Sequence, residues 1–380
     1  MTRHSKLSKQ KKILVCLLRK KLTISMRVMQ HILSDDVDVV GIIKRDSFEF
    51  YRSQSMRLYE IGETSFRCGV ERDVFDEIMG MCRPRDAVIT SVIRLTIFLQ
   101  YAREGLTQSV LSKNCGVSQP TISRILCETI DDINRFAGKF IRFPQSRADV
   151  LDLQSGFFDK LDRNGDLRCV PCYGVLDGKH WETEHPPNSG SLSFNYKAYC
   201  SFNSLFVCSA DCRILYVQIS ECGGNSDAQL FREGPLGELL ERAAYAGGLR
   251  TLPGSSIVMP PFILADNGFG LSKHVMQPYR DHNRTTENMD FNDKICGTRV
   301  KIENLFGILT TKFRVFRRAL NLCPTSSQGL ILSLSVIHNL TVPKREAVQF
   351  DYETPILIDP YKTAEDQRTA LKKYLKTIEQ

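Results

Sequence analysis

Two aspartates in this sequence each follow a short apolar run, and a glutamate lies in a later segment with helical spacing. Asp177 comes directly after Tyr173–Leu176, Asp266 comes directly after Phe262–Ala265, and Glu303 lies further on. Such apolar runs predict buried strands, and the apolar spacing around Glu303 predicts an amphipathic helix. Strand ends and a packed helix can bring three carboxylates to one point. Either aspartate alone could mark a simple turn, but the two in this order favour a site.

Three carboxylates at one point would form a site of hard oxygen ligands, which suits Mg²⁺ or Mn²⁺. Two such ions, about 3.5–4 Å apart, can activate a hydroxyl nucleophile and stabilise the leaving oxygen of a phosphodiester. The sequence therefore predicts Asp177, Asp266 and Glu303 as metal ligands and catalytic residues. Gly178 directly follows the first aspartate, and a residue without a side chain leaves room beside a metal.

Basic side chains crowd the stretch around Glu303. Arg299 lies four residues earlier, on the same helical face. Lysine and arginine side chains beside an acidic site would neutralise the phosphates of DNA. DNA contacts are therefore predicted for Arg299, Lys301, Lys312 and Arg314. The alternative is an ordinary solvated helix face, on which Arg299 and Glu303 form a surface ion pair.

A second pattern has the order of a helix-turn-helix. An amphipathic helix is predicted over Val92–Arg103, and a shorter helix is predicted over Leu106–Asn114. A turn with Gly116 follows, and Ser118 is placed to cap a further helix that has Pro120 in its first turn. The start of that last helix would read the major groove. DNA contacts are predicted there for Gln119, Thr121 and Arg124. The alternative is a packed helical hairpin with a polar end.

The 13 cysteines are scattered through a long chain without the spacing of a small disulfide framework, so reduced thiols are expected. Cys169 and Cys172 form one Cys-x-x-Cys pair close to His180 and His185. A zinc site normally needs four ligands. Further ligands could come from Cys208, Cys212 and Cys222. These three lie in strand-like segments, where a small buried cysteine is common, so zinc binding is kept as an alternative only.

Four parts are expected along the chain. A basic arm occupies residues 1–40, and a helical region that contains the helix-turn-helix (about 92–133) occupies residues 41–150. An α/β domain is expected over residues 151–345, and a charged tail over residues 346–380. Within the α/β domain, the patterns predict strands at Tyr196–Phe202, Leu205–Ser209 and Ile214–Ser220, a loop at 247–261, and helices at 292–313 and 326–340.

The formal net charge of +8 favours polyanionic partners, nucleic acid first and an anionic membrane surface second. A merely solvated surface would carry the same charge. The run Ile13–Leu18 is shorter than a signal-peptide core of roughly 7–15 residues, and no segment approaches the ~20 apolar residues of a membrane span. We therefore expect a soluble chain without a membrane partner. The basic clusters around Ile13–Leu18 could be a nuclear import signal, a phosphate-binding arm or a solvated helix.

The C-terminal half resembles the DDE transposases of the PIF/Harbinger superfamily and the nucleases derived from Harbinger transposases. The resemblance covers roughly residues 170–340 and rests on the order and spacing of several short pieces. These pieces are Gly174–Gly178, Pro186–Tyr199, Asn225–Asp227, Leu264–Phe269, Gln277–Tyr279, Arg299–Gly307, Lys312–Arg314 and Ile337–Asn339. The stretch Gly116–Arg124 is likewise similar to recognition-helix starts in this family.

The resemblance implies a ribonuclease-H-like fold in the α/β class, with a mixed sheet flanked by helices and an all-α region before it. It also implies a DDE metal site. The first aspartate of the family falls on Asp177, the second on Asp266 and the glutamate on Glu303. Asp227 matches a further acidic position, which the resemblance adds to the metal site in a supporting role.

Two positions depart from the pattern of the family. Lys179 stands where many members carry a small polar residue, and Phe269 stands where a tyrosine is common. Neither departure removes a carboxylate, so the acidic set is complete.

Together, these patterns predict a DNA endonuclease or transposase that uses Mg²⁺ or Mn²⁺ to hydrolyse or transfer phosphodiester bonds. The alternative is a catalytically silent DNA-binding or interaction protein derived from a transposase. The resemblance implies a nuclear location, with the cytoplasm as a second compartment, and a separate Myb-like DNA-binding partner. Assembly into a homo-oligomer is a further expectation.

Overall fold

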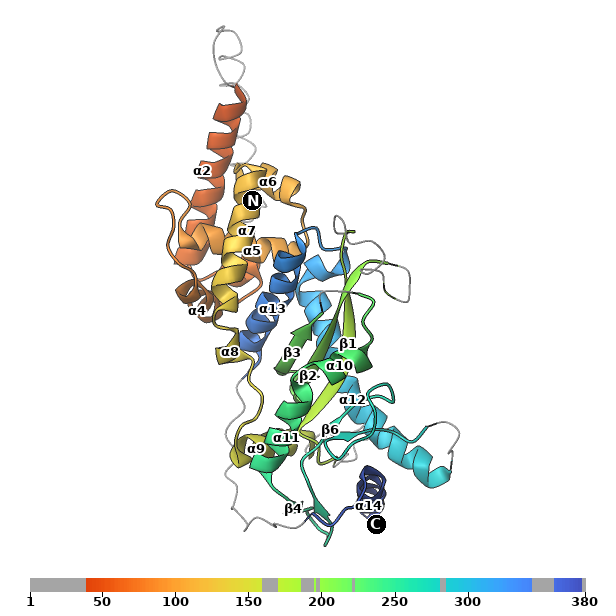
Figure 1. Ribbon diagram of the computed structural model, residues 1–380. Helices are drawn as coiled ribbons and strands as arrows, with labels where there is room; N and C mark the ends of the chain where they lie inside the picture. The colour runs from red at the N-terminus through yellow and green to blue at the C-terminus, as the bar shows by residue number, and fades with distance from the viewer. Residues whose placement is uncertain are drawn as a thin grey trace, which may run out of the picture.

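The computed structural model describes residues 39–158, 170–185, 195, 199–220, 223–280, 285–343 and 359–377. The predicted basic arm up to residue 38, most of the resembling piece at 186–199 and the tail at 346–358 lie outside these ranges. A helical part and a sheet part follow one another along the long direction of Figure 1, and the C-terminal helix lies at the end opposite to α2.

The helical part is built around α5 (Ser91–Glu104), which is buried on all sides from Val92 to Ala102. A helix that is buried all round belongs to a core. Most of the other helices of this part contact α5. The other helices of this part are α2 (Val39–Glu60), α3 (Thr64–Cys68), α4 (Arg72–Met81), α6 (Gln108–Cys115), α7 (Gln119–Asn134), α8 (Ala137–Phe140) and α9 (Arg147–Phe158).

The far end of α7 is fixed by one buried carboxylate. Asp132 is fully buried and accepts hydrogen bonds from the backbone N–H and Nε of Arg83, at 3.1 and 3.0 Å. Arg85 Nη2 and Arg135 Nη2 donate to the same carboxylate at 2.8 and 2.6 Å. A buried charge needs partners of this kind, and this network ties the segment after α4 to α7.

The sheet has five strands in the order β3-β2-β1-β6-β7. They are β1 (Gly174–Glu182), β2 (Ser201–Cys208), β3 (Ile214–Ile219), β6 (Ile263–Leu264) and β7 (Val275–Met276). The first three strands pair antiparallel, and β6 and β7 join β1 in parallel. This mixed sheet, preceded by helices, confirms the predicted ribonuclease-H-like α/β fold.

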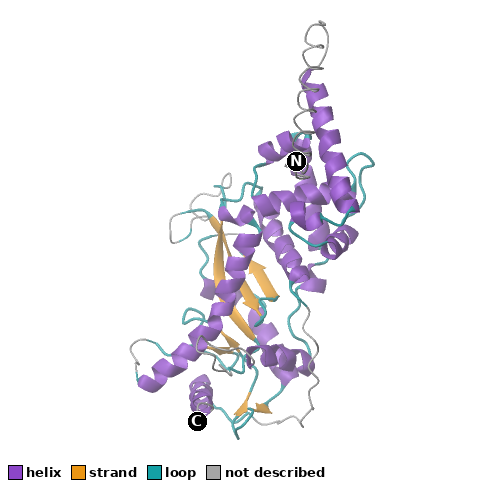
Figure 2. Cartoon of the chain, turned by 180° about the vertical axis from the view of Figure 1, so that it is seen from behind, coloured by secondary structure: helices purple, strands orange, loops and turns teal. Residues whose placement is uncertain are grey.

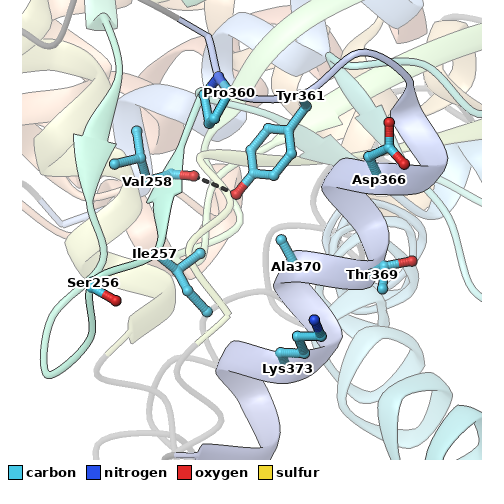
Figure 3. Close-up of a pocket in the computed structure, with 9 residues that line it drawn as sticks. All are labelled: Ser256, Ile257, Val258, Pro360, Tyr361, Asp366, Thr369, Ala370 and Lys373. Atoms are coloured by element: carbon cyan, nitrogen blue, oxygen red, sulfur yellow. Dashed lines mark hydrogen bonds between the residues drawn. The ribbon is translucent and has the colours of Figure 1, made fainter.

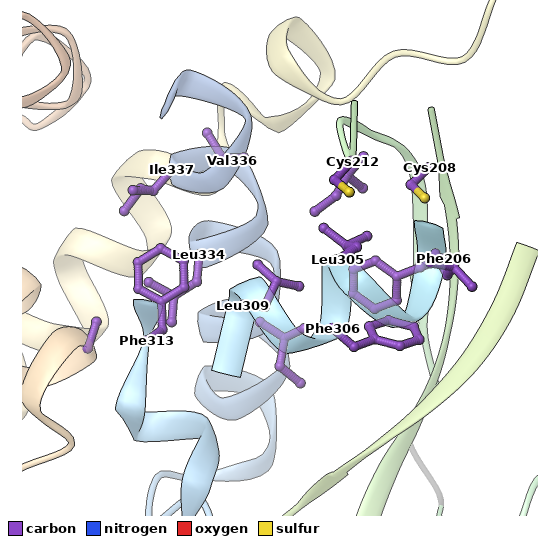
Figure 4. Close-up of a cluster of buried hydrophobic side chains, with 14 of the residues drawn as sticks. Phe206, Cys208, Cys212, Leu305, Phe306, Leu309, Phe313, Leu334, Val336 and Ile337 are labelled. Atoms are coloured by element: carbon purple, nitrogen blue, oxygen red, sulfur yellow. The ribbon is translucent and has the colours of Figure 1, made fainter. Parts of the chain in front are cut away.

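Helices cover both faces of the sheet, as Figures 1 and 2 show. On one face, Val175 and Phe206 belong to a core shared with α12 (Thr286–Lys312) and α13 (Pro324–Thr341). Figure 4 shows Leu305 and Phe306 of α12 packed beside Phe206. On the other face, Leu176 belongs to a second core with α10 (Asp227–Glu233) and α11 (Leu236–Gly247). Residues therefore alternate between the α12 face and the α10 face along β1.

Several predicted boundaries differ from the structure. β1 does not end at Asp177, because its antiparallel pairing with β2 continues as far as Glu182. β2 joins the end of the strand predicted at 196–202 to the strand predicted at 205–209. Residues 196–198 lie outside the described ranges. α12 begins at Thr286, before residue 292. The predicted loop at 247–261 contains a short hairpin of β4 (Arg250–Thr251) and β5 (Val258–Met259).

The last helix, α14 (Ala364–Thr377), packs against the first half of α12. Lys376 Nζ donates to Glu287 at 2.8 Å, and Lys294 Nζ donates to the Leu375 carbonyl at 2.8 Å. Leu371 and Leu375 are buried, so this part of the charged tail contributes to the fold. Among the residues described, no helix is long and apolar enough to span a bilayer.

Candidate metal and nucleic-acid site

Asp177 and Asp266 lie at equivalent positions beside each other. β1 and β6 run parallel, with Val175 opposite Leu264. Asp177 is two residues beyond Val175, and Asp266 is two residues beyond Leu264. Neighbouring strands lie about 4.8 Å apart, and residues two apart on a strand point to the same face. The register therefore brings both aspartates to the α12 face of the sheet, where β6 ends.

The Asp177 carboxyl group is partly buried and close to other charges. Burial raises its pKa, and the negative charges of Asp266 and Asp227 raise it further, to about 6. Two groups act in the opposite direction, namely the Gly178 N–H, which donates to Asp177 Oδ1 at 2.8 Å, and the Arg299 guanidinium. Carboxylates that crowd one another in this way form a site that a cation would stabilise.

Asp266 is held in a tight turn after β6. The Gly268 N–H donates to Asp266 Oδ1 at 2.9 Å, and Gln277 Nε2 donates to the Asp266 carbonyl at 2.6 Å. A Cβ atom on Gly268 would lie 3.0 Å from Asp266 Oδ1, so a glycine suits the close approach. Backbone and side chain of Asp266 are thus both fixed at the strand end.

Asp227 approaches β1 from the opposite face of the sheet. A Cβ atom on Gly178 would lie 2.2 Å from Asp227 Cγ, so the missing side chain of Gly178 makes room for this carboxylate. Asn203 Nδ2 donates to Asp227 Oδ1 at 2.7 Å. Because Gly178 and Asp177 point to opposite faces, the strand separates the two carboxyl groups. Asp227 nevertheless raises the pKa of Asp177 through its charge, and its supporting role at the metal site stays a prediction.

Glu303 lies on an exposed flank of α12 between two residues that approach β1. Arg299, one turn earlier, is close enough to Asp177 to lower the pKa of its carboxyl group. Phe306, three residues later, packs edge-on against Trp181 of β1, with ring centroids 6.5 Å apart. Residues three and four apart share a helical face. Glu303 therefore lies on the flank of α12 that faces the Asp177 region of β1.

The donor chemistry of these residues fits a divalent cation, since Mg²⁺ and Mn²⁺ prefer carboxylate oxygens. The described ranges contain no group of three His, Cys, Asp or Glu side chains close enough together to hold a metal ion. The register thus sets Asp177 beside Asp266, but these two and Glu303 do not form a ready group of three ligands. The oxygen donors of the aspartate pair fit such an ion, and Glu303 as a third ligand stays a prediction.

The basic residues predicted to contact DNA lie in different surroundings. Arg314 is exposed in the short 3-10 helix η2 (Arg314–Arg317). Arg299 lies beside Asp177. Lys301 is two residues further along the helix, a rotation of about 200°, and lies near Cys208. These three remain predicted DNA contacts, but they do not form one continuous patch on a single helix face.

Lys312, the fourth basic residue predicted to contact DNA, has a partner within the protein. Its ammonium group donates a hydrogen bond to the Thr341 hydroxyl group in α13 and lies 5.4 Å from the centre of the Phe313 ring. Burial lowers its pKa to about 8. A phosphate contact needs an accessible charge, whereas this amine connects the end of α12 to α13. The structure therefore gives Lys312 a packing role, and its contact with DNA stays a prediction.

The turn of the predicted helix-turn-helix is formed as expected. Gly116 ends α6 with φ at +67°, a left-handed conformation that favours glycine. A Cβ atom there would lie 2.5 Å from the Lys44 carbonyl of α2, so α2 packs directly on the turn. Ser118 caps α7, where its hydroxyl accepts from the Thr121 N–H at 3.4 Å.

The start of α7 presents two of its three predicted DNA contacts to solvent. Gln119 and Arg124 are exposed, as a groove-reading helix requires. Thr121 is half-buried, and its hydroxyl lies 2.8 Å from that of Ser118. DNA contact by these residues stays a prediction.

The cysteines considered as zinc ligands lie in apolar surroundings where the structure describes them. Cys172, Cys208 and Cys212 are buried, and burial raises the pKa of the Cys172 and Cys208 thiols. Zinc binds the thiolate, which such burial disfavours. Cys169 and Cys222 lie outside the described residues. The nearby His338 lies in α13 with Nε2 2.7 Å from the Cys212 carbonyl oxygen, a contact that packs the helix on the sheet.

A cavity of about 530 Å³ lies away from the carboxylates, between the β4–β5 hairpin and α14. Figure 3 shows Asp366 and Lys373 of α14 on one side and Val258 on the other, with the Tyr361 hydroxyl donating to the Val258 carbonyl. One carboxylate beside a lysine does not make a metal site. The aspartate pair therefore remains the candidate functional site.

One comparison with known proteins matches the part of the chain that holds this site. Residues 176–339 match the family described as DDE superfamily endonuclease. This stretch contains all three predicted carboxylates and runs from β1 to α13, so the chain carries a domain of the DDE superfamily.

The chain is also distantly similar to the HARBI1 proteins of Xenopus laevis, Homo sapiens and Bos taurus, a Harbinger transposase-derived group. The identities are 24%, 24% and 25%, over 70–71% of this chain and 72–74% of each relative. No solved structure matches this chain.

Some residues that shape the site were not found from the sequence. Asn203, which holds Asp227, lies between two predicted strands and has no local signal of its own. Gln277, which holds the Asp266 backbone, lies in a piece of the family resemblance, which did not indicate its role. The aromatic pair Trp181 and Phe306, which joins β1 to α12, could be found only by knowing that β1 continues past Asp177.

Proposed function

We propose that this chain is a DNA endonuclease or transposase in which Asp177, Asp266 and Glu303 hold divalent metal ions. The observation that carries the proposal is the parallel register of β1 and β6, which sets Asp177 beside Asp266. The raised pKa of Asp177 supports it, because the cause includes the charge of Asp266. The DDE superfamily match and the HARBI1 relatives, which are named as candidate nucleases, point to the same chemistry.

Each residue of the site has a definite task in this proposal. Asp177 and Asp266 are the first two ligands, held by β1 and by the turn after β6. Glu303 turns from its exposed flank of α12 to supply the third carboxylate. When bound, Mg²⁺ or Mn²⁺ supplies activation of a water or 3′-hydroxyl and stabilisation of the departing 3′-oxygen. Asn203 and Asp227 fix the opposite side of β1 at Gly178.

DNA is the proposed substrate, and α7 is the helix proposed to contact it. The exposed Gln119 and Arg124 would contact base edges or phosphates while the capped start of α7 enters the groove. Action in the nucleus, cooperation with a Myb-like DNA-binding partner, and assembly with further copies of the chain belong to the same proposal.

A second candidate function is a DNA-binding protein without catalysis. One observation favours it, namely that the described residues hold no group of three side chains ready for a metal ion. In that case Glu303 would stay on its exposed flank and the aspartate pair would serve the fold alone.

Incubation of the purified protein with supercoiled plasmid and Mg²⁺ or Mn²⁺ separates the two functions. We expect nicked plasmid with the natural chain, and no nicking with Asp177→Asn, with Asp266→Asn or after chelation by EDTA. Nicking that survives both substitutions would come from a contaminant. No nicking by any form, together with unchanged DNA binding, would favour the second function.

A further inference from the structure

Lys179 lies on the face of β1 that carries Asp177, two residues further along the strand. Its ammonium nitrogen is 5.6 Å from the centre of the Phe306 ring and 5.8 Å from the centre of the Trp181 ring. Phe306 belongs to α12 and comes three residues after Glu303. The lysine therefore lies between the strand of the first carboxylate and the helix of the third.

The backbone and the aromatic rings restrict where this lysine can reach. Ser204, its register partner on β2, donates a hydrogen bond from Oγ to the Lys179 carbonyl at 2.7 Å. Trp181 Nε1 donates to the same Ser204 Oγ at 2.9 Å. The indole is buried and also packs against Phe316 at 4.3 Å between ring centroids. A cation over fixed rings keeps a definite position, and the half-buried lysine stem loses little freedom when it binds an anion.

The charge of Lys179 matters because of its neighbours. Asp177, Asp266 and Glu303 are negative, and a phosphodiester that approaches them is negative as well. Coulomb repulsion in a partly buried site is stronger than in water. An ammonium group at this position would offset that repulsion on the Glu303 side of Asp177, while Arg299 offsets it closer to Asp177 itself. Lysine is a compact, freely orientable donor for phosphate oxygens.

We propose that Lys179 binds a non-bridging phosphate oxygen of the DNA strand at the carboxylate site. The proposal rests on DNA being the substrate, as proposed above, but it needs binding only and not cleavage. Lys179 would set the position of the phosphate relative to Asp177 and Asp266, and the rings of Phe306 and Trp181 would set the position of Lys179.

The chain itself supplies a local reporter for this contact, because Trp181 is its single tryptophan. Movement of the ammonium group from the indole to a phosphate would change the fluorescence of Trp181. The experiment titrates dye-labelled duplex DNA against the full chain in Ca²⁺. The dye anisotropy gives the affinity and its salt dependence, and the tryptophan emission reports events beside Lys179.

Three variants give the comparison. Lys179→Met keeps the stem over the rings and removes the charge, while Lys179→Arg keeps the charge. Lys139→Met is the matched control, since Lys139 also lies over a ring, that of Phe140 at 4.9 Å, but in α8. Equal urea midpoints show that the variants are folded.

We expect Lys179→Met to bind DNA about tenfold more weakly, as for one charged hydrogen bond, and to lose the change in Trp181 emission. The slope of log affinity against log salt should fall by about 0.9, the value for one phosphate. Lys179→Arg should keep the slope, and Lys139→Met should keep the emission change.

Wild-type affinity, slope and emission change in Lys179→Met would overturn the proposal, as would absence of DNA binding by the natural chain. DNA binding that depends on Lys179 without nicking in Mn²⁺ would instead contradict only the proposed nuclease function.

Discussion

The ionised carboxyl group of Asp177 destabilises the folded chain at neutral pH. Burial and the charges of Asp266 and Asp227 raise its pKa from the ordinary 3.8 to about 6. The folded state therefore holds this proton more tightly than the unfolded state does. The protonated carboxyl group therefore stabilises the folded state below pH 4, and this stabilisation is lost as the pH rises through 6.

Asp177→Asn should remove this unfavourable charge and stabilise the fold. We expect the free energy of unfolding at pH 7 to rise by about 1–2 kcal/mol, which is less than the full shift because the group is only partly buried. Urea unfolding at pH 7 and at pH 4 measures the difference. A variant that is less stable at pH 7 than the natural chain would mean that Asp177 is held by a favourable partner instead.

The same carboxyl group should make metal binding depend on pH. A metal ligand must be deprotonated, so Mn²⁺ affinity should fall steadily as the pH is lowered from 7.5 through 6 to 5. Calorimetric titration at these three pH values gives the profile. Affinity that stays level down to pH 5 would show that Asp177 is ionised well below 6 or does not bind the ion.

Residue patterns along the chain could predict the aspartate pair but not its surroundings. Asp177 and Asp266 follow apolar runs, and parallel strands align such positions without any further information. Asp227 was different, because its position in the sequence does not reveal which face of the sheet it approaches. Lys312 was also different, since the spacing of basic residues cannot show that one of them is half-buried and donates a hydrogen bond to Thr341.

At the scale of elements, β1 depends on a residue without a side chain at position 178. A Cβ atom there would meet the Asp227 carboxyl group, which Asn203 holds in place. We expect Gly178→Ala to lower the free energy of unfolding by about 1–3 kcal/mol, as overpacking does, and to lower nicking of plasmid. Thermal unfolding and the plasmid assay measure both effects.

Gly237→Ala is the matched control for that substitution. Gly237 lies in the first turn of α11 with nothing within 4 Å of its added Cβ, and alanine favours helix. It should leave nicking unchanged. If Gly178→Ala behaves like Gly237→Ala, Asp227 is free to move away and does not fix β1.

Helix α7 should carry a measurable part of DNA affinity. Arg124 is exposed near its start, so Arg124→Ala should weaken duplex binding and reduce the salt slope by about 0.9. Arg242→Ala, which removes an exposed arginine from α11, is the control and should change neither. Fluorescence anisotropy at several salt concentrations measures the affinity and the salt slope of each variant. Equal slopes for the two variants would exclude Arg124 as a DNA contact.

The ends of some elements were hard to predict from local sequence patterns. The odd-numbered residues of β1 after Asp177 are Lys179 and Trp181, so no alternation of apolar and polar side chains marks the rest of the strand. Only the pairing with β2 reveals it. The two-residue strands β6 and β7 depend on neighbours in the sheet in the same way.

For the whole molecule, the C-terminal helix stabilises the fold at a distance from the carboxylates. Leu371 of α14 is fully buried. From Glu287, which pairs with α14, to Glu303 the α12 axis rises about 24 Å. Leu371→Ala should lower the free energy of unfolding by about 2–4 kcal/mol. Nicking per folded molecule should stay unchanged, and a fall in it would show that α14 is coupled to the site. Lys373→Ala, at an exposed position of α14, is the control.

The binding of Mn²⁺ to the full chain tests the central claim most directly. Calorimetric titration at pH 7.5 should show Mn²⁺ uptake by the natural chain, weakened at least about tenfold in each of Asp177→Asn, Asp266→Asn and Glu303→Gln, as expected when one charged ligand is lost. No uptake by the natural chain, or uptake that is equal in all four proteins, would contradict a shared three-carboxylate site.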